Sequence, residues 1–124
     1  MQLLKAVKAY KAITDLGEEK LNFKTAHSLL VAKKELEPHI EFFTQEEMKL
    51  VNEYAVKGED GKVSFENGNF QLTAENAEKY VEKHRELDEV EIDIKKKRLP
   101  PIDNVSISAL EALSEIFDFE EGEE

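Results

Sequence analysis

The longest helical pattern in the sequence spans residues 25–56, and it constrains the fold more than any other feature. Large apolar residues recur along it at seven-residue intervals, and further apolar residues accompany them at helical spacing. The repeating row consists of Leu29, Leu36, Phe43 and Leu50. A continuous helix of that length would be about 48 Å long at 1.5 Å per residue. We therefore expect one long helix against which the other elements pack.

Pro38 lies inside this pattern and determines whether the helix is continuous. A proline in a regular helix interior costs about 3 kcal/mol, because it lacks the amide hydrogen and its ring clashes with the preceding turn. The seven-residue row nevertheless crosses Pro38 without slipping, which favours one helix kinked there. Thr44 and Glu47 have the spacing of a capping box, so a break near residue 43 and a helix-turn-helix are the alternative.

A shorter amphipathic helix is predicted before the long one, over residues 3–16. Lys5, Lys8 and Lys11 stand on one side of it, and apolar residues recur on the other. Gly17 follows at the position of a C-terminal cap. The expected buried residues are Leu3, Val7, Tyr10, Ile13 and Leu16.

The pattern changes after the long helix, where a turn at residues 58–61 introduces a hairpin. Asn67-Gly68 is a strong hairpin signal, because both residues tolerate a positive φ. We expect Phe65 to face Phe70 across the two strands.

A third helix and a third strand follow. Thr73 is the expected cap of a helix over residues 74–89, whose apolar face is thin. That face consists of Ala77, Tyr80, Val81, His84 and Leu87. Residues 90–95 then alternate between apolar and charged side chains, which predicts a strand that Pro100 ends.

A last helix is predicted to begin at Ser106 or Ser108, the latter forming a capping box with Glu111. Its expected buried residues are Ile107, Leu110, Leu113, Ile116 and Phe117. We expect one domain over residues 1–118 and a disordered acidic tail over residues 119–124. The fold class is therefore α+β and mostly helical, with four helices and a small antiparallel hairpin or three-stranded sheet.

Charge is the most distinctive property of the chain, whose formal net charge is -11. Residues 1–34 carry seven lysines against three acids, so the acidic excess lies in the remainder of the chain. Such a surface repels nucleic acid and favours a partner with a basic surface.

The basic run at Lys95, Lys96, Lys97 and Arg98 is the exception to this charge pattern. Alternation along a strand divides these side chains between two faces, and no aromatic residues interleave with them for base stacking. We expect no direct contact with nucleic acid. The four cations are expected to neutralise acids of the protein's own helices and of FDFEEGEE.

Motifs that carry chemistry are missing from the sequence. It contains no cysteine, no glycine-rich phosphate loop and no serine in a nucleophile elbow. With 28 Asp and Glu residues, close carboxylate pairs arise by chance and identify no general acid or base. We therefore expect a protein that is not an enzyme and uses no cofactor.

The three histidines do not have the spacing of a metal motif. His27 and His39 lie twelve residues apart, about 18 Å along a continuous helix. We expect no metal site within one subunit, although a bent helix or an oligomer leaves metal binding by His27, His39 or His84 open.

No stretch approaches the roughly 20 apolar residues of a membrane span, and the lysines among the first residues do not fit a signal peptide. We expect a soluble protein of the bacterial host cytoplasm without membrane contact.

The order of features resembles a group of small phage and prophage proteins of unknown function. These proteins open with a short Y-x-x-I-x-x-L helix and continue with a long charged helix, a D-G turn and a strand pair. The matching residues are Tyr10, Ile13, Leu16, Leu21–Lys24, Ala26, Lys34–Leu36, Tyr54, Asp60–Lys62, Phe70 and Val90–Ile94, before a Ser-capped last helix. The resemblance implies a phage or prophage origin and brings no activity. An unbroken long helix is typical of the group, and Pro38 departs from it.

Two functions follow as hypotheses. In the first, the protein is an acidic inhibitor of a host nucleic-acid-binding defence factor, such as an RNA-guided nuclease. It would work like an acidic anti-CRISPR protein or DNA mimic, with carboxylates in place of phosphates. The expected contact residues are acids of the long helix, or alternatively of the tail; those of the long helix are Glu35, Glu41, Glu46, Glu47 and Glu53.

In the second hypothesis, the protein is a virion assembly factor, tail accessory protein or chaperone that acts through helical contacts. The seven-residue row of the long helix would then form a subunit interface and a homo-oligomer. The competing interpretation of that row is core packing against the first and third helices.

Overall fold

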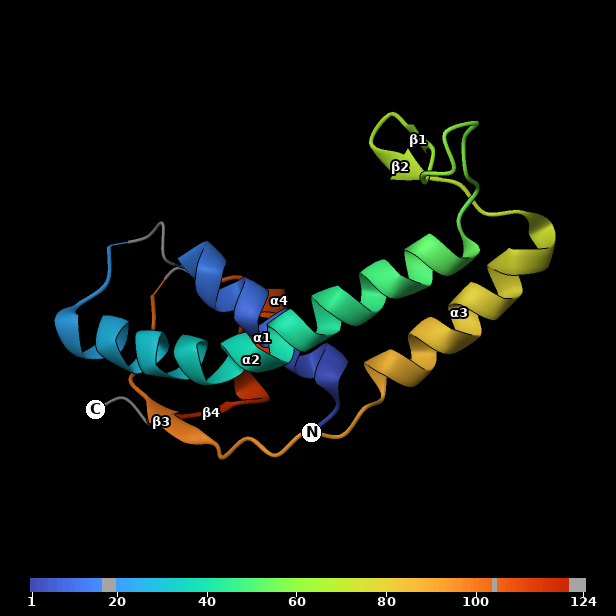
Figure 1. Cartoon of the computed structure of the whole chain (residues 1–124). Helices are drawn as coiled ribbons and strands as arrows, with labels where there is room; N and C mark the ends of the chain where they lie inside the picture. The colour runs from blue at the N-terminus through green and yellow to red at the C-terminus, as the bar shows by residue number, and fades with distance from the viewer. Residues whose placement is uncertain (17–19, 104, 121–124) are drawn as a thin grey trace.

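The computed structural model describes residues 1–16, 20–103 and 105–120. Over these residues the helices are α1 (Leu3–Leu16), α2 (Phe23–Tyr54), α3 (Ala74–Asp88) and α4 (Ile107–Ser114). Four short strands complete the structure: β1 (Phe65–Glu66), β2 (Asn69–Phe70), β3 (Lys97–Leu99) and β4 (Phe117–Phe119). The predicted α+β, mostly helical class is confirmed. Figure 1 shows a body built from α1, α4, β3, β4 and one half of α2, and an arm that extends away from it.

The long helix α2 is continuous through Pro38, which confirms the favoured prediction of one helix, and the alternative break near residue 43 does not occur. Figure 1 shows its two halves running in different directions, as expected for a helix bent at a proline. Pro38 is exposed, so water can satisfy the carbonyl group that its ring leaves without an intrahelical donor. No described helix has the length and apolar character needed to cross a bilayer.

The seven-residue row of α2 lies in the interior of the protein. Leu29, Leu36 and Phe43 are buried and Leu50 is half-buried. Leu29 and Leu36 belong to the core of the body, while Phe43 packs with Leu3 and Leu87 at the root of the arm. Core packing is therefore the role that this row has within the chain.

Helix α1 lies against the body half of α2. Leu3, Ile13 and Leu16 are buried as predicted, and the three lysines of its other face are exposed. Three alanines share this buried face, and their small side chains allow the neighbouring helices to approach closely. They are Ala6, Ala9 and Ala12. The predicted cap at Gly17 lies outside the described residues.

The last helix is shorter than predicted. Ser106 caps α4 by accepting a hydrogen bond from the Ala109 amide (3.1 Å). Leu113 is fully buried, but Ile107 is 78% exposed, so the expectation that both lie in the core is wrong for Ile107. Leu110 is also exposed. An eight-residue helix makes little more than two turns, and one narrow side of it meets α1.

The chain after α4 forms a strand rather than a helical turn and a tail. Strand β4 pairs in parallel with β3, with Lys97 opposite Phe117 and Leu99 opposite Phe119. The Glu120 amide donates to the Leu99 carbonyl (2.8 Å), so ordered structure passes the expected boundary at residue 118. Ile116 and Phe117 are buried as predicted, although both follow the end of α4. Residues 121–124 lie outside the described range.

The predicted third strand, which begins at residue 90 and which Pro100 ends, is regular only over its last residues, as β3, and residues 90–95 are corrected. This segment forms a single isolated bridge, between Glu91 and Gln2, and the next regular strand begins at Lys97. Hydrogen bonds from the Leu3 amide to the Val90 carbonyl (2.8 Å) and from the Ile92 amide to the Met1 carbonyl (2.9 Å) hold it beside the start of α1. The described strands therefore form two separate pairs, one antiparallel and one parallel.

The basic run contacts acids of its own chain, as expected. Lys97 forms an ion pair with Glu35 of α2, and Lys96 lies 3.7 Å from a carboxylate oxygen of Asp118 in β4. The first contact ties β3 to α2, and the second joins the segment of β3 to β4.

The arm consists of residues 41–90, which include the second half of α2, the hairpin and α3 (Figure 1). The hairpin has the predicted register, with Phe65 opposite Phe70. Its turn residues Asn67 (φ 52°) and Gly68 (φ 80°) both lie in the left-handed region, as the two-residue turn requires. Thr73 caps α3 by accepting from the Asn76 amide (3.1 Å).

Candidate functional site

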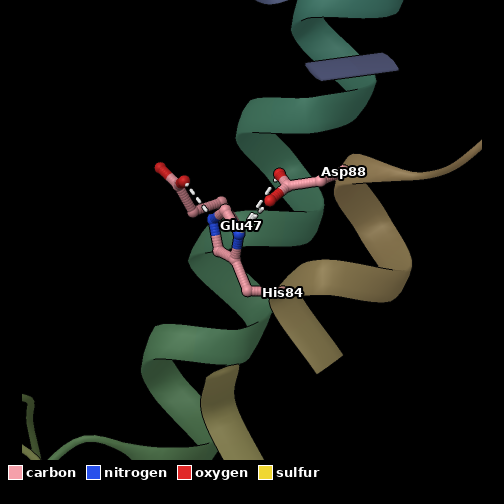
Figure 2. Close-up of polar contacts among 3 residues, drawn as sticks. All are labelled: Glu47, His84 and Asp88. Carbon is pink, nitrogen blue, oxygen red and sulfur yellow. Dashed lines mark hydrogen bonds and ion pairs between the residues drawn. The ribbon is translucent and has the colours of Figure 1, made fainter. Parts of the chain in front are cut away.

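A histidine between two carboxylates joins the two helices of the arm (Figure 2). His84 Nε2 lies 2.8 Å from an oxygen of Glu47 on α2, and Nδ1 lies 3.2 Å from Asp88, one turn later on α3. The side chains of His84 and Asp88 are both 22% exposed. We refer to Glu47, His84 and Asp88 as the clamp.

Aromatic side chains continue from the clamp in both directions. The His84 ring meets Phe43 edge-on at 5.8 Å between centroids and lies 5.6 Å from the ring of Tyr80. Tyr80 in turn contacts Phe70 of the hairpin at 5.5 Å. This row of rings connects α2, α3 and the hairpin, so the clamp lies within the packing that gives the arm its shape.

The clamp changes the acidity of its histidine. Burial alone would lower the pKa of His84, but the hydrogen bond with Glu47 and the negative charge of Asp88 outweigh it and raise the pKa above 6.5. Burial, followed by the charges of Glu47 and Asp88, raises the pKa of the Tyr80 phenol. His84 is therefore stabilised as an imidazolium that donates to both carboxylates.

The chemistry of this arrangement is that of an ion-paired contact. Both ring nitrogens face carboxylates, and these are the hydrogen-bond partners of His84 among the described residues. A charge-assisted bond at each nitrogen fixes the ring and holds α3 against α2. The clamp positions the outer face of α3 and the hairpin.

The five acids predicted to contact a partner do not form one surface. Glu35 pairs with Lys97, Glu46 with Lys49 (2.9 Å) and Glu47 with His84. Glu41 and Glu53 are exposed, with no ion pair to another described residue. Three of the five carboxylates are thus neutralised within the chain.

A continuous row of acids lies instead on α3. Five glutamates at three- and four-residue intervals fall within about a quarter of the helix circumference, and all are exposed. They are Glu75, Glu78, Glu82 and Glu86 of α3 and Glu89, the C-cap residue that follows it, and we call them the acidic stripe. One of the five, Glu86, has a close cation, the exposed Lys83 at 3.5 Å. The spacing is readable in the sequence, but our prediction concentrated on the long helix and missed it.

An apolar groove of about 670 Å³ lies between the end of α2 and the hairpin. Its apolar lining residues come from both walls: Met48, Val51, Val63, Phe65 and Phe70. Met48 and Phe65 are each 60% exposed, which is high for large apolar side chains. Lys57 and Lys62 also line it.

The three histidines have different surroundings. His27 is exposed and stacks on Phe23 with 6.4 Å between ring centroids, His39 is half-buried and His84 belongs to the clamp. Within residues 1–16, 20–103 and 105–120, no group of three or more histidine and acidic side chains has the geometry to hold a metal ion.

Comparison with known proteins found no match among family models, curated proteins or solved structures. The resemblance to phage proteins therefore remains a prediction from the sequence.

Proposed function

We propose that this protein is a non-enzymatic binding protein whose acidic arm occupies a basic, nucleic-acid-binding surface of a partner protein. In the phage setting that the sequence resemblance implies, the partner is a host defence factor and the protein is its inhibitor. The observation that carries the proposal is the acidic stripe on α3.

The spacing of the stripe supports recognition by a phosphate-binding surface. Three or four residues of helix rise separate successive glutamates by about 4.5–6 Å along the axis. One strand of B-DNA carries one phosphate charge per 3.4 Å of axis. The glutamates of the stripe therefore have somewhat more than half the linear charge density of a DNA strand, before the cations Lys79, Lys83 and Arg85 of the same helix are counted, and the helix packs against α2.

The charge of the whole arm points the same way. Residues 41–90 contain thirteen Asp and Glu against six Lys and Arg. The clamp turns His84 and Asp88 towards α2, and the stripe lies on the outer surface of α3. A partner approaching the arm therefore meets carboxylates, and its own cations gain electrostatic attraction that speeds association.

Affinity capture from bacterial lysate tests this proposal. We expect the wild-type chain to retain a nucleic-acid-binding protein at low salt, to lose it at high salt, and to compete with nucleic acid for it. Retention that is insensitive to salt, or a partner that still binds its nucleic acid in the complex, would contradict the proposal.

A matched pair of variants separates the stripe from net charge. In the stripe variant Glu78, Glu82 and Glu86 become Gln, and in the control variant the exposed body residues Asp15, Glu37 and Asp103 become Asn, Gln and Asn. Both variants lose three negative charges. The stripe variant should lose the partner, and the control variant should keep it.

Assembly through protein contacts is the second candidate function, and the apolar groove favours it. The row of Leu29, Leu36 and Phe43 does not contribute a surface for it, because these residues are buried within the chain. An assembly role would therefore use the exposed groove of the arm.

A further inference from the structure

We propose that the groove between α2 and the hairpin binds a segment of another protein that carries a large apolar side chain next to an acidic residue. This site is distinct from the acidic stripe, and the inference does not depend on the proposed function. The two surfaces select opposite charges.

The apolar part of the ligand follows from the lining. Met48 and Val51 come from α2, Phe65 and Phe70 come from the hairpin, and Val63 comes from the segment before it, where it forms an isolated bridge with Lys57. Met48 and Phe65 each leave 60% of their surface in water, so a ligand side chain placed between them would remove apolar area from solvent on both walls. Methionine also adapts its shape to irregular ligands.

The acidic part follows from the charged residues of the groove. Glu47 lines it, but this carboxylate is compensated by His84 at 2.8 Å. Lys57 and Lys62 are exposed, and neither ammonium group lies within ion-pair distance of an acid in the described part of the chain. Glu59 and Asp60 lie in the same turn, where Asp60 accepts from the Lys62 amide (3.0 Å), but neither lines the groove. The two lysines therefore provide the cations among the lining residues, and we call them the lysine rim.

The openness of the site favours a protein segment over a small molecule. Small-molecule sites bury about 70–90% of their ligand, whereas the most prominent apolar residues of this groove are themselves more than half exposed. A groove of this kind suits a peptide whose anchor side chain is covered and whose backbone stays in contact with water. A carboxylate beside that anchor could reach the lysine rim and gain a charge-assisted hydrogen bond.

Titration of the isotope-labelled full-length chain with two matched peptides tests the inference. Both peptides carry the same Leu and Phe anchors; one has Asp and Glu around them and the other has Lys. The acidic peptide should shift the backbone amide resonances of Met48, Val51, Val63 and Phe65 and should bind at least tenfold more tightly than the basic peptide.

Two variants decide which features of the groove act. Changing both Lys57 and Lys62 to Glu should lower the affinity for the acidic peptide at least tenfold and raise the affinity for the basic one. Met48→Ser should lower the affinity for both peptides. The control is Val81→Ser, at a comparably exposed apolar residue of α3, and it should leave both affinities unchanged.

Several results would overturn the inference. These are no binding of either peptide, or equal binding of both. A third is that the acidic peptide shifts the protein resonances around the lysines of α1 instead of those of the groove. Groove resonances that move with protein concentration before any peptide is added would assign the site to a second copy of the chain, which would also contradict it.

Discussion

The clamp makes the stability of the arm depend on pH, and the substitution His84→Gln isolates that dependence. The folded pKa of His84 is raised above its ordinary value of 6.5. A histidine with a raised folded pKa contributes stability that is fully present below the unfolded pKa. That contribution is lost as the pH rises through the higher folded pKa.

The size of the effect follows from the contacts. A hydrogen bond to a charged group contributes about 1.5–3 kcal/mol when shielded from water, and exposed ion pairs contribute about 0–1 kcal/mol. The two contacts of His84, at 2.8 and 3.2 Å, lie between these limits because the ring is 22% exposed. Neutral histidine keeps one N–H, so deprotonation removes one contact and leaves a ring lone pair facing a carboxylate. We expect a loss of about 1–2 kcal/mol.

Urea denaturation of wild type and His84→Gln between about pH 5.5 and 8.5 measures this loss. Tyr80 stays neutral in this range, because its pKa is raised above 10.0. The variant should be less stable than wild type by about 1–2 kcal/mol at the acidic end, and the difference should shrink as the pH rises. A shift of this size corresponds to about 4–8 °C in Tm for a chain of this length.

The matched control is His27→Gln, because His27 is exposed and has no carboxylate contact among the described residues. Because this variant removes no contact of the clamp, it should keep the pH-dependent contribution of His84. If His84→Gln also runs parallel to wild type across the range, the clamp does not hold α3 against α2 through an imidazolium and the reasoning is wrong.

Three further predictions concern the remaining packing. Lys97→Glu should destabilise the protein by about 1–2 kcal/mol, because it replaces the ion pair with Glu35 by repulsion. The control Lys95→Glu should change the free energy of unfolding by less than about 0.5 kcal/mol. Chemical denaturation of both variants compares them. Leu113→Ala should lower the free energy of unfolding by about 2–5 kcal/mol, because Leu113 is fully buried. Ile107→Ala should leave it nearly unchanged, because Ile107 is 78% exposed. Thermal unfolding of the two variants measures the difference. Gly68→Ala should cost about 1 kcal/mol, because the backbone there has a φ of +80°, which an alanine rarely adopts. The added Cβ itself would meet nothing within 4 Å, so the cost comes from the backbone alone. Hydrogen exchange of the hairpin amides measures it.

Local signals in the sequence predict much of this fold because their physical causes are local. Asn67 and Gly68 specify the hairpin through their tolerance of positive φ, and the caps at Thr73 and Ser106 follow from side chains that bond amides three residues later. The seven-residue row predicts α2 across Pro38, because burial of Leu36 and Phe43 on either side outweighs one lost backbone bond.

Long-range pairing is what the sequence does not reveal. Strand β4 forms because Phe117 and Phe119 align with β3 some twenty residues earlier, and its three residues alone give too short an alternation to identify a strand. The same limit applies to the predicted acids. Glu35 and Glu47 are neutralised by Lys97 and His84, which lie 62 and 37 residues away in the chain. The stripe on α3 depends only on helical spacing and was readable.

The direct test of the acidic arm is the salt dependence of partner binding, measured for wild type and for the stripe variant with Glu78, Glu82 and Glu86 changed to Gln. The account predicts that wild-type affinity falls steeply with ionic strength, and that the stripe variant binds more weakly and with a shallower slope. The control variant Asp15→Asn, Glu37→Gln, Asp103→Asn should keep the wild-type slope. Equal slopes and affinities for wild type and the stripe variant would contradict the account.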